Sequence, residues 1–377
     1  MNKALGLYFH IPFCRSKCTY CDFYSFAAKP DVQAEYAVAL AQVADTLRPR
    51  AQGYTVDTVY FGGGTPSVLA PEAFASVMDA AKRYAIAEGA EITTEANPAP
   101  LDPNLLPFWR KMGVNRLSFG MQSAIDEELR IIGRRHRAED LAVAVGAAKS
   151  CGIDNISLDL MLGLPGQTAE SVAASLSAAL ALAPTHLSVY CLKLEEGTTL
   201  ARMVESGRVS LPDDEAVAEW YLTTAETLVR EGFEHYEISN FALPGYRSRH
   251  NMRYWQRAEY LGFGPAAHSF FAEERRYFAA DIQAFVQNAH MGTLDWILDD
   301  PADPIEETLI LSLRTADGLD LAALATLTGE QTAAQIGQDL ARLIPGGHVR
   351  QTAAGYALTA QGMLVSNTIL SDLLLRL

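Results

Sequence analysis

Three cysteines near the start of the chain have a spacing that suits iron–sulfur chemistry. Cys14, Cys18 and Cys21 lie within LGLYFHIPFCRSKCTYCDFYSF at 5–26, on a segment that follows a short apolar run. Three thiolates can bind three corners of a four-iron cubane, which leaves the fourth iron without a protein ligand. An iron with an open position can bind a small molecule, so the spacing predicts a [4Fe–4S] cluster that takes part in chemistry.

A structural zinc ion is the alternative interpretation of the same cysteines. Structural zinc sites take four ligands, commonly as paired Cys-x-x-Cys units. The chain has no second pair, and His10 is the nearby candidate for a fourth ligand. A zinc-stabilised protein without catalytic activity, or a chance trio of buried cysteines, therefore remains an alternative.

The motif CxxxCxxC with an aromatic residue, Tyr20, before the third cysteine resembles the radical S-adenosylmethionine (SAM) family. The resemblance implies that SAM chelates the open iron and that the reduced cluster passes an electron to the sulfonium, which yields a 5′-deoxyadenosyl radical. The string HIPFC…CxYCDF is similar to the HemN-like branch, which contains oxygen-independent coproporphyrinogen dehydrogenase (HemN) and the heme chaperones of the HemW subgroup. This resemblance extends over essentially the whole chain.

The resemblance also implies a set of SAM-binding side chains. These positions are Tyr8, Gly63, Gly64, Thr65, Glu95, Gln122, Arg134 and Asp159. Carboxylates suit ribose hydroxyls, an arginine suits the methionine carboxylate, and glycines let the backbone lie close to a ligand. Each position also has an ordinary explanation: a sharp turn for FGGGTP, a solvated charge for Arg134 and a capping side chain for Gln122. Glu95 and Asp159 are the strongest candidates, because an acid inside an apolar strand is unfavourable unless it is paired or bound.

A segment dense in aromatic residues, HYEISNFALPGYRSRHNMRYWQRAEYLGFGPAAHSF, begins at 235 and contains a possible heme site. An imidazole can ligate heme iron, aromatic rings can stack on the macrocycle and guanidinium groups suit its propionates. Composition alone also fits a packed aromatic loop with a buried histidine. The string HNxxYW, however, resembles a heme-linked motif of the HemW subgroup, which makes His250 the predicted iron ligand, with His268 and His10 as weaker alternatives. Its neighbours here are Arg247, Arg249, Arg253, Tyr254 and Trp255.

Two departures from the dehydrogenase favour the heme chaperone within this branch. The dehydrogenase motif continues with a further cysteine two positions after the third, where this chain has Phe23, and it has a long N-terminal extension, where only 13 residues precede Cys14. We therefore expect heme transfer to an acceptor protein whose identity the sequence does not give. A true radical enzyme, either a porphyrinogen dehydrogenase or a HemN-like methyltransferase, is the alternative.

The composition narrows the class of protein further. The 377 residues are 49% hydrophobic and carry a formal charge of −15, which argues against a nucleic-acid or anionic-membrane surface. The sequence contains neither a signal-peptide pattern nor an apolar run of about 18–20 residues. Cys151 and Cys191 are isolated, so the five cysteines form no disulfide framework. These features predict a cytoplasmic protein without stable membrane insertion.

The candidate residues must be positioned by an α/β fold. Short β-rich runs alternate with helical stretches about every 30 residues, which is typical of βα units around a parallel sheet. We expect six strands, at about 5–11, 56–61, 90–96, 114–119, 153–160 and 185–193. Six units are too few for a closed eight-stranded barrel, so the pattern and the resemblance both predict a partial (β/α)6 barrel of the radical SAM type. The candidates then fall at the carboxyl ends of the strands, where such folds place their active sites.

The remaining chain is predicted to form two further regions. The barrel is expected at 1–235, an aromatic-rich connecting segment of loops and short strands laid across it at 236–300, and a smaller C-terminal domain at 301–377. The tail reads as helices followed by a two-stranded wing, similar to a winged helix. Residues 305–377 contain four arginines and no lysine, so DNA binding is not expected there.

Overall fold

The computed structural model describes residues 3–377, and their contacts divide the chain into two compact units. The first unit comprises the chain up to Val217 together with Glu259–Asp299, and the second comprises Ala218–Ala258 together with Asp300–Leu377. The chain changes unit close to the expected boundary at 300, but the expected boundary at 235 has no counterpart, since the other changes lie at 217/218 and 258/259. The expected connecting segment is therefore shared between the two units. The reason is that its second half pairs with strands of the first unit, as described below.

The first unit is built on a sheet whose central strands follow the chain in order and run parallel. The order is β12-β11-β10-β9-β1-β2-β3-β4-β5-β6, and the pairs from β1 to β6 are all parallel. The six central strands are β1 (Lys3–Ile11), β2 (Tyr54–Gly63), β3 (Ile86–Ala96), β4 (Arg116–Gln122), β5 (Asn155–Leu162) and β6 (His186–Cys191). The predicted α/β class and its six parallel strands are confirmed, whereas closure into a partial barrel stays a prediction.

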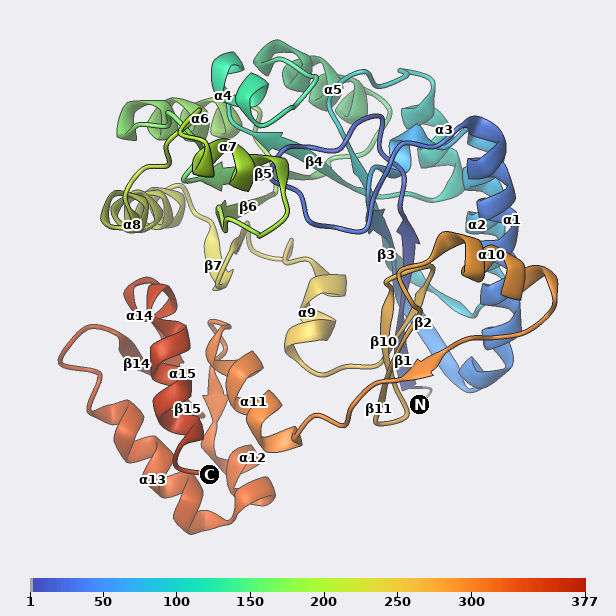
Figure 1. The fold of residues 1–377 in the computed structure, drawn as a ribbon. Helices are drawn as coiled ribbons and strands as arrows, with labels where there is room; N and C mark the ends of the chain where they lie inside the picture. Colours follow the sequence, from blue (N-terminus) through green and yellow to red (C-terminus); the bar gives the residue numbers. More distant parts are fainter. Residues whose placement is uncertain (1–2) are drawn as a thin grey trace. The chain divides into compact units, whose positions relative to one another are not determined.

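Helices connect these strands and pack around the outside of the sheet, as Figure 1 shows. They are α1 (Pro30–Leu47), α2 (Pro71–Lys82), α3 (Leu105–Met112), α4 (Asp126–Ile131), α5 (Ala138–Ser150), α6 (Ala169–Ala181), α7 (Thr199–Glu205) and α10 (Ile282–His290), with short 3₁₀ turns at Arg48–Ala51 and Pro66–Val68. Helix α8 (Asp214–Arg230) contains the boundary between the two units. Within residues 3–377, no helix combines the length and the apolar character that a membrane span requires.

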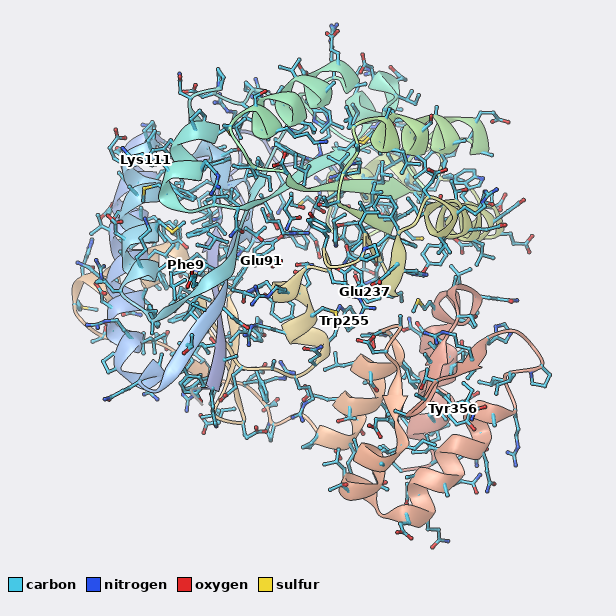
Figure 2. The ribbon with its side chains drawn as sticks, turned by 180° about the vertical axis from the view of Figure 1, so that it is seen from behind. Phe9, Glu91, Lys111, Glu237, Trp255 and Tyr356 are labelled. Carbon is cyan, nitrogen blue, oxygen red and sulfur yellow. The ribbon has the colours of Figure 1, made fainter. Side chains whose placement is uncertain are left out.

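Alternation along the strands gives the sheet an apolar face and a polar face. On the apolar face Phe9, labelled in Figure 2, stacks on Phe61 and Phe263 with ring centroids 5.1 and 4.8 Å apart. We call the opposite side of β2 to β6 the polar face. Its residues are Thr58, Tyr60, Glu91, Thr93, Glu95, Arg116, Ser118, Ser157, Asp159, His186 and Ser188. Most of them are buried, so this face is an internal polar surface and not a solvated one.

Strand β9 (Tyr260–Phe263) differs from the sequence prediction for the aromatic-rich segment. We expected loops and short strands laid across the barrel, but β9 pairs in parallel with β1 and extends the sheet at that edge. Strands β10 (His268–Phe271), β11 (Glu274–Tyr277) and β12 (Ile297–Leu298) continue the sheet antiparallel. The physical reason is that the outer edge of β1 carries backbone groups that a strand satisfies better than a loop.

The second unit begins with a hairpin and a short helix. These are β7 (Glu234–Glu237), β8 (Asn240–Ala242) and α9 (Arg249–Trp255). Its C-terminal part has a small sheet in the order β13-β15-β14, and a buried cluster that includes Leu313, Ile336 and Leu370. The elements there are α11 (Pro304–Leu313), β13 (Leu319–Asp320), α12 (Leu321–Thr328), α13 (Glu330–Ala341), β14 (Val349–Gln351), β15 (Gly355–Leu358), α14 (Ala360–Leu364) and α15 (Ser366–Leu374). The expected wing is the β14–β15 hairpin, and the sequence did not indicate its third strand.

Candidate functional site

The cysteine loop leaves the carboxyl end of β1 and is closed by backbone hydrogen bonds. The N–H of Cys14 donates to Phe26 O at 3.0 Å, and the N–H of Phe26 donates to Pro12 O at 2.9 Å. The middle of the loop is fixed at Thr19, whose N–H donates to Ile132 O at 3.0 Å and whose carbonyl accepts from Leu200 N at 2.7 Å. The loop that carries the cysteines is therefore anchored at its base and at its middle.

The cysteine thiols lie close enough to influence one another and are partly shielded from solvent. All three are half-buried and free of disulfide bonds. Burial raises the pKa of the Cys21 thiol, and the charges of Cys18 and Cys14 raise it further, while Lys17 lowers it. A group that holds three thiolates together must therefore supply positive charge, as a metal cluster does.

The distances between the three thiols decide whether they can hold a single metal ion or a cluster. Across residues 3–377, no three His, Cys, Asp or Glu side chains gather closely enough for a single metal ion. Ligands of a cubane each bind a different iron, so they do not need to converge on one point. The donor set of three sulfurs on one loop fits a cluster with an open iron.

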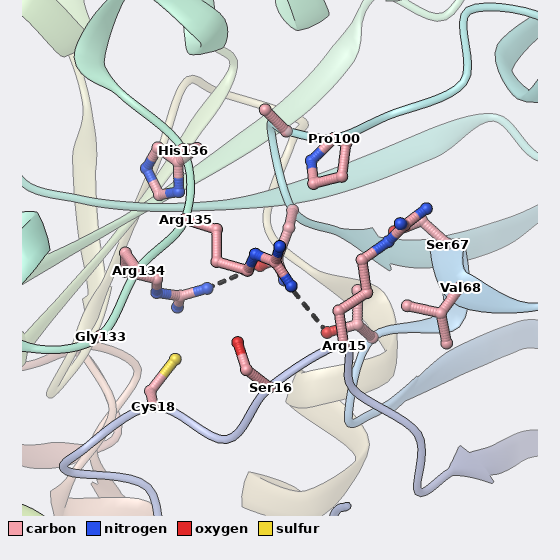
Figure 3. A pocket seen from close by; sticks show the side chains of 13 residues that line it. Arg15, Ser16, Cys18, Ser67, Val68, Pro100, Gly133, Arg134, Arg135 and His136 are labelled. Carbon is pink, nitrogen blue, oxygen red and sulfur yellow. Dashed lines mark hydrogen bonds between the residues drawn. The ribbon is translucent and has the colours of Figure 1, made fainter. Parts of the chain in front are cut away.

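A hollow opens beside this loop (Figure 3). Cys18 and Thr65 line it, together with three arginines, Arg15, Arg134 and Arg135, and no acidic residue belongs to its described lining. Thr65 also approaches the loop directly, since its Oγ1 lies 3.5 Å from the Cys14 Sγ. The space next to the thiols is thus suited to a ligand that carries negative charge.

The glycine segment at the end of β2 packs tightly against β1 and the cysteine loop. Gly63 has φ +105°, and a Cβ there would lie 2.3 Å from the His10 ring, while a Cβ on Gly64 would lie 2.6 Å from Phe13 O. Only glycine fits at these two positions without displacing the backbone or the ring. Close packing is sufficient to explain them, so their contact with SAM stays a prediction.

Glu95, at the end of β3, is held by two neighbours on the sheet. The Tyr60 hydroxyl donates to its Oε1 at 2.8 Å, and the Gly63 N–H donates to its Oε2 at 3.2 Å. Burial, assisted by the charge of Asp159, raises the pKa of Glu95 to about 7, although these hydrogen bonds act in the opposite direction. Near neutral pH this carboxyl therefore changes its charge easily.

Tyr8 on β1 belongs to the same neighbourhood. Its hydroxyl lies 3.0 Å from His10 Nδ1, and burial followed by the charge of Glu95 raises the pKa of Tyr8 well above its usual value. The Nε2 of His10 is bonded to Tyr24 O at 3.0 Å. His10 therefore supports the base of the loop through both ring nitrogens.

Asp159, late in β5, accepts from polar side chains of the two adjacent strands. The Ser118 hydroxyl on β4 lies 3.3 Å from its Oδ1, and Ser188 on β6 is its other hydrogen-bond partner. Burial raises the pKa of Asp159, whereas these bonds and the charges of Arg116 and Arg134 lower it. The carboxylate is thus fixed from both sides in the middle of the polar face.

Arg134 and Gln122 meet above Gly120 on β4. A Cβ on Gly120 would lie 2.9 Å from Arg134 Nη2 and 3.0 Å from Gln122 Nε2. Gln122 is buried and has φ +65°, an unusual backbone conformation for a residue other than glycine. Arg134 donates to Asn97 Oδ1 at 2.6 Å and to the Tyr20 hydroxyl at 2.9 Å.

The Nε–H of Arg134 has no hydrogen-bond partner in the described chain. One donor of this buried guanidinium is therefore unsatisfied by the protein.

The structure brings all the predicted cluster and SAM residues into the first unit. All but Arg134 lie on strands β1 to β5 or directly after them, and Arg134 lies in the turn after α4. Sequence reasoning missed three polar residues that connect them: Asn97, Ser118 and Arg116. Asn97 links Arg134 to the Thr65 hydroxyl, to which it donates at 3.2 Å. Asn97 lies two residues after Glu95, and this closeness was an available signal. Ser118 and Arg116 lie four and six residues before Gln122, so only the register of the strands brings them to the site.

His250 lies in the second unit, near the start of α9, and its ring is already bonded. Its Nε2 lies 2.9 Å from the Tyr254 hydroxyl, the two rings are perpendicular, and His250 is only 1% exposed. Arg253 is buried as well. Arg247 donates to Glu234 at 2.9 Å and to Asp317 at 3.0 Å.

His268, the other alternative, is exposed on β10 in the first unit, 3.8 Å from Asp299. Of the two, only His250 therefore lies among the aromatic and basic residues of the HNxxYW string.

Comparison with known proteins gives two family models and many curated relatives. The Radical SAM superfamily matches residues 8–179, and the HemN C-terminal domain matches residues 299–365. Heme chaperone HemW from Bacillus subtilis is 34% identical over 375 residues, which covers 96% of this chain and 97% of the relative. Heme chaperone HemW from Synechocystis is 35% identical, covering 97% and 95%.

A solved structure and a eukaryotic relative extend this similarity. The structure of coproporphyrinogen III oxidase (HemN) from Escherichia coli matches with a TM-score of 0.84 at 24% identity, and the match covers 99% of this chain and 90% of the other. The mitochondrial radical SAM domain-containing protein 1 of Danio rerio is 32% identical, covering 99% and 87%. The structural likeness supports the fold, and the sequence likeness over whole chains identifies the family. The chain therefore belongs to the HemW family of radical SAM proteins.

Proposed function

We propose that the protein is a heme chaperone that binds a [4Fe–4S] cluster, SAM and heme, and transfers heme to an acceptor protein. The observation that carries this proposal is the whole-length similarity to relatives named heme chaperone HemW, together with both family domains. Membership of the radical SAM family implies the cluster and SAM as cofactors. The names of the relatives support heme as the cargo.

Cys14, Cys18 and Cys21 would hold the cluster. When bound, a cluster with one open iron supplies electrons to the sulfonium of SAM. The anchored loop fixes where the thiolates lie, and Thr65 borders Cys14 on one side. Arginines of the adjacent hollow offset the negative charge that three thiolates bring.

The SAM ligand would lie at the mouth, over the polar face. Glu95 and Asp159 supply carboxylates for ribose hydroxyls, and the guanidinium of Arg134, which lines the hollow, suits a carboxylate. Gln122 lies beside Arg134 above Gly120, and Thr65 is connected to Arg134 by Asn97, so both belong to the same site. Tyr8 and the Gly63–Gly64 backbone form its wall next to β1.

Heme would bind in the second unit near His250. Because the Nε2 of His250 is bonded to the Tyr254 hydroxyl, iron ligation through that nitrogen requires this hydrogen bond to exchange. Arg247 is paired with Glu234 and Asp317, so it would have to give up a carboxylate to contact a propionate. Arg249 and Arg253 are the other candidates for the propionates. The heme site therefore involves rearrangement of side chains on and near α9.

The dehydrogenase remains the second candidate function, since its structure has the same fold. Phe23 stands where that enzyme has a further cysteine, and its side chain is 64% exposed. An exposed phenylalanine cannot replace a thiol in ligand binding or proton transfer. This difference supports a chaperone over a coproporphyrinogen dehydrogenase.

The compartment that we propose is the cytoplasm. All five cysteines are free thiols in the described structure, and a reducing compartment suits a protein that must keep thiolates for a cluster. The net charge of −15 disfavours nucleic acid as a partner, so the acceptor of heme is proposed to be a protein.

The test is anaerobic reconstitution of the full chain with iron, sulfide and SAM, followed by titration with heme. We expect the broad brown absorption of a cubane, a saturable heme spectrum, and transfer of heme to added apoproteins. A zinc protein would not show the brown absorption of a cubane. Anaerobic decarboxylation of coproporphyrinogen by the same sample, with release of 5′-deoxyadenosine, would replace the chaperone with the dehydrogenase.

A further inference from the structure

One buried cation lies on the polar face among several carboxylates. Arg116 begins β4, is only 2% exposed, and its Nε–H has no hydrogen-bond partner in the described chain. Burying a guanidinium with an unsatisfied donor is unfavourable unless neighbouring negative charge compensates for it. The same face carries three acidic side chains, Glu91, Glu95 and Asp159.

The register of the strands places Arg116 two residues before the level of Glu95 on β3 and four residues before the level of Asp159 on β5. Arg116 pairs with Thr93, and two residues further along, Ser118 pairs with Glu95. Residues two apart on a strand project from the same face, so Arg116 and Ser118 share it. Ser118 is level with Glu95 and donates to Asp159, so Arg116 lies one step before the residue of β4 that lies between the two carboxylates.

The electrostatics of the face match this placement. The charge of Arg116 lowers the pKa of Glu95 and of Asp159, in each case against the larger effect of burial. Glu95 is further disfavoured as an anion by the negative charge of Asp159.

The other titratable groups that face Glu95 and Asp159 do little to offset the negative charge of these two carboxylates. Tyr8 and Tyr60 are phenols with pKa values that burial raises well above the usual range, and burial lowers the pKa of His186 on β6, with Arg116 as a further cause. Glu91 on β3 is another acid on this face. Arg134, in the turn after α4, acts on Asp159 from the side of the mouth.

We propose that Arg116 is a positioning residue for the SAM site, whose buried charge keeps Glu95 and Asp159 ionised and in place to accept hydrogen bonds from the ligand. The role in SAM binding rests on the proposed function, whereas the effect on the two carboxyls does not. A side chain that only filled space at this position could be replaced by a neutral one of similar length without changing either carboxyl.

Infrared difference spectroscopy of the SAM-free full chain tests the electrostatic part. The titration of Glu95 is identified by subtracting the spectrum of a Glu95→Gln variant. We expect a midpoint near pH 7 in the wild type. In Arg116→Gln the midpoint should rise, and Arg116→Lys should restore most of the difference. The matched control is Arg110→Gln, which removes an exposed arginine of α3 and should leave the midpoint unchanged.

SAM binding measured across pH 6–9 tests the functional part. Arg116→Gln should bind SAM more weakly near pH 7, with recovery at higher pH, because a higher midpoint lowers the ionised fraction of Glu95. A rise of about one pH unit would lower that fraction at pH 7 from about one half to about one tenth, which weakens binding roughly fivefold. An unchanged Glu95 midpoint in Arg116→Gln would overturn the proposal. If the wild type binds no SAM, the proposed function fails, and the infrared titration still decides what Arg116 does.

A second comparison covers the case in which Arg116→Gln does not fold. The double variant Arg116→Gln/Asp159→Asn removes the buried cation together with one carboxylate, so the net charge of the face is balanced. Its Glu95 midpoint should lie above that of Asp159→Asn alone. Equal midpoints in these two variants would also overturn the proposal.

Discussion

The two candidate regions are assembled in opposite ways. In the first unit, the candidate groups come from the ends of separate strands and are bonded to one another, as in Tyr60–Glu95–Gly63 and Ser118–Asp159. In the second unit, the candidates come from one short segment, and their polar atoms are paired with protein partners, as in His250–Tyr254. A site that is built from separate strands is preorganised for its ligand, whereas a site whose groups are already paired must exchange partners.

The largest effect should come from removing one thiolate of the preorganised region. Cys18→Ala leaves two protein ligands, which cannot hold a cubane, so iron should fall from about four per chain to none after reconstitution. Cys14→Ala and Cys21→Ala should behave alike, whereas Cys151→Ala, outside the loop, should keep its iron. Four irons per chain in the triple cysteine variant would remove the cluster assignment.

Loss of the Glu95 carboxylate should weaken SAM binding without removing the cluster. Hydrogen bonds to a charged group contribute about 1.5–3 kcal/mol, so Glu95→Gln should lower SAM affinity roughly 10- to 100-fold by calorimetry. Wild-type affinity should also fall as the pH drops below about 7, where Glu95 becomes protonated, and the variant should not show this dependence. Glu88→Gln, an exposed acid on the same strand, serves as the control.

The same substitution should stabilise the protein when no ligand is bound. The pKa of Glu95 rises from 4.5 to about 7 on folding, so the ionised form disfavours the folded state. This penalty grows as the pH rises from about 4.5 to about 7 and is constant above that, with an upper limit of about 3 kcal/mol. Chemical denaturation should therefore find Glu95→Gln more stable than the wild type at pH 8, with little difference at pH 4.5. Lower stability of the variant at pH 8 would contradict the proposed ionisation.

In the locally paired region, the expected effect is spectroscopic. His250→Ala removes an imidazole but leaves apolar surface for the macrocycle, so it should shift the heme spectrum and slow heme transfer more than it weakens binding. His290→Ala is the control, because that histidine is exposed on α10. His10→Ala is unsuitable, since its ring packs on Gly63 and supports the cysteine loop. An identical heme spectrum in His250→Ala would place the iron ligand elsewhere.

The smallest effect concerns Arg247. Its side chain and its two partners are substantially exposed, with Arg247 at 32% and Asp317 at 57%, and exposed ion pairs contribute about 0–1 kcal/mol. Arg247→Ala should therefore change the free energy of unfolding by less than about 1 kcal/mol and leave SAM affinity unaltered. A heme affinity that also stays unaltered would exclude Arg247 from the propionate site.

The sequence predicted the regular part of the fold and the candidates that lie at strand ends. Runs such as VDTVYF and NISLDLML identify their strands because β-branched and apolar residues follow one another. Strand β9 was missed, since YLGF is too short to show a pattern and its pairing with β1 depends on residues about 250 positions away. Long-range pairing of this kind leaves no local signal.

The polar contacts between candidates were also beyond prediction. Arg116 reads in the sequence as an ordinary charge at the start of a strand. Only the folded chain shows that it is buried and that it shares the polar face with Glu95 and Asp159. The FGGGTP segment was predicted for its likeness to a ligand loop, yet the structure gives its glycines a packing reason as well. Sequence reasoning identifies residue types, whereas the neighbours that set their charge belong to other strands.

The pairing of β1 with β9 has a consequence for the order of synthesis. The first strand of the sheet leaves the ribosome early, but its outer neighbour ends at Phe263. At about 5–20 residues per second, translation needs roughly 10–50 s to cover that interval. During this time the nascent chain exposes an open strand edge next to the three cysteines. Strand β9 can pair with that edge only after most of the polypeptide has been made. The base of the cysteine loop is therefore completed late in synthesis.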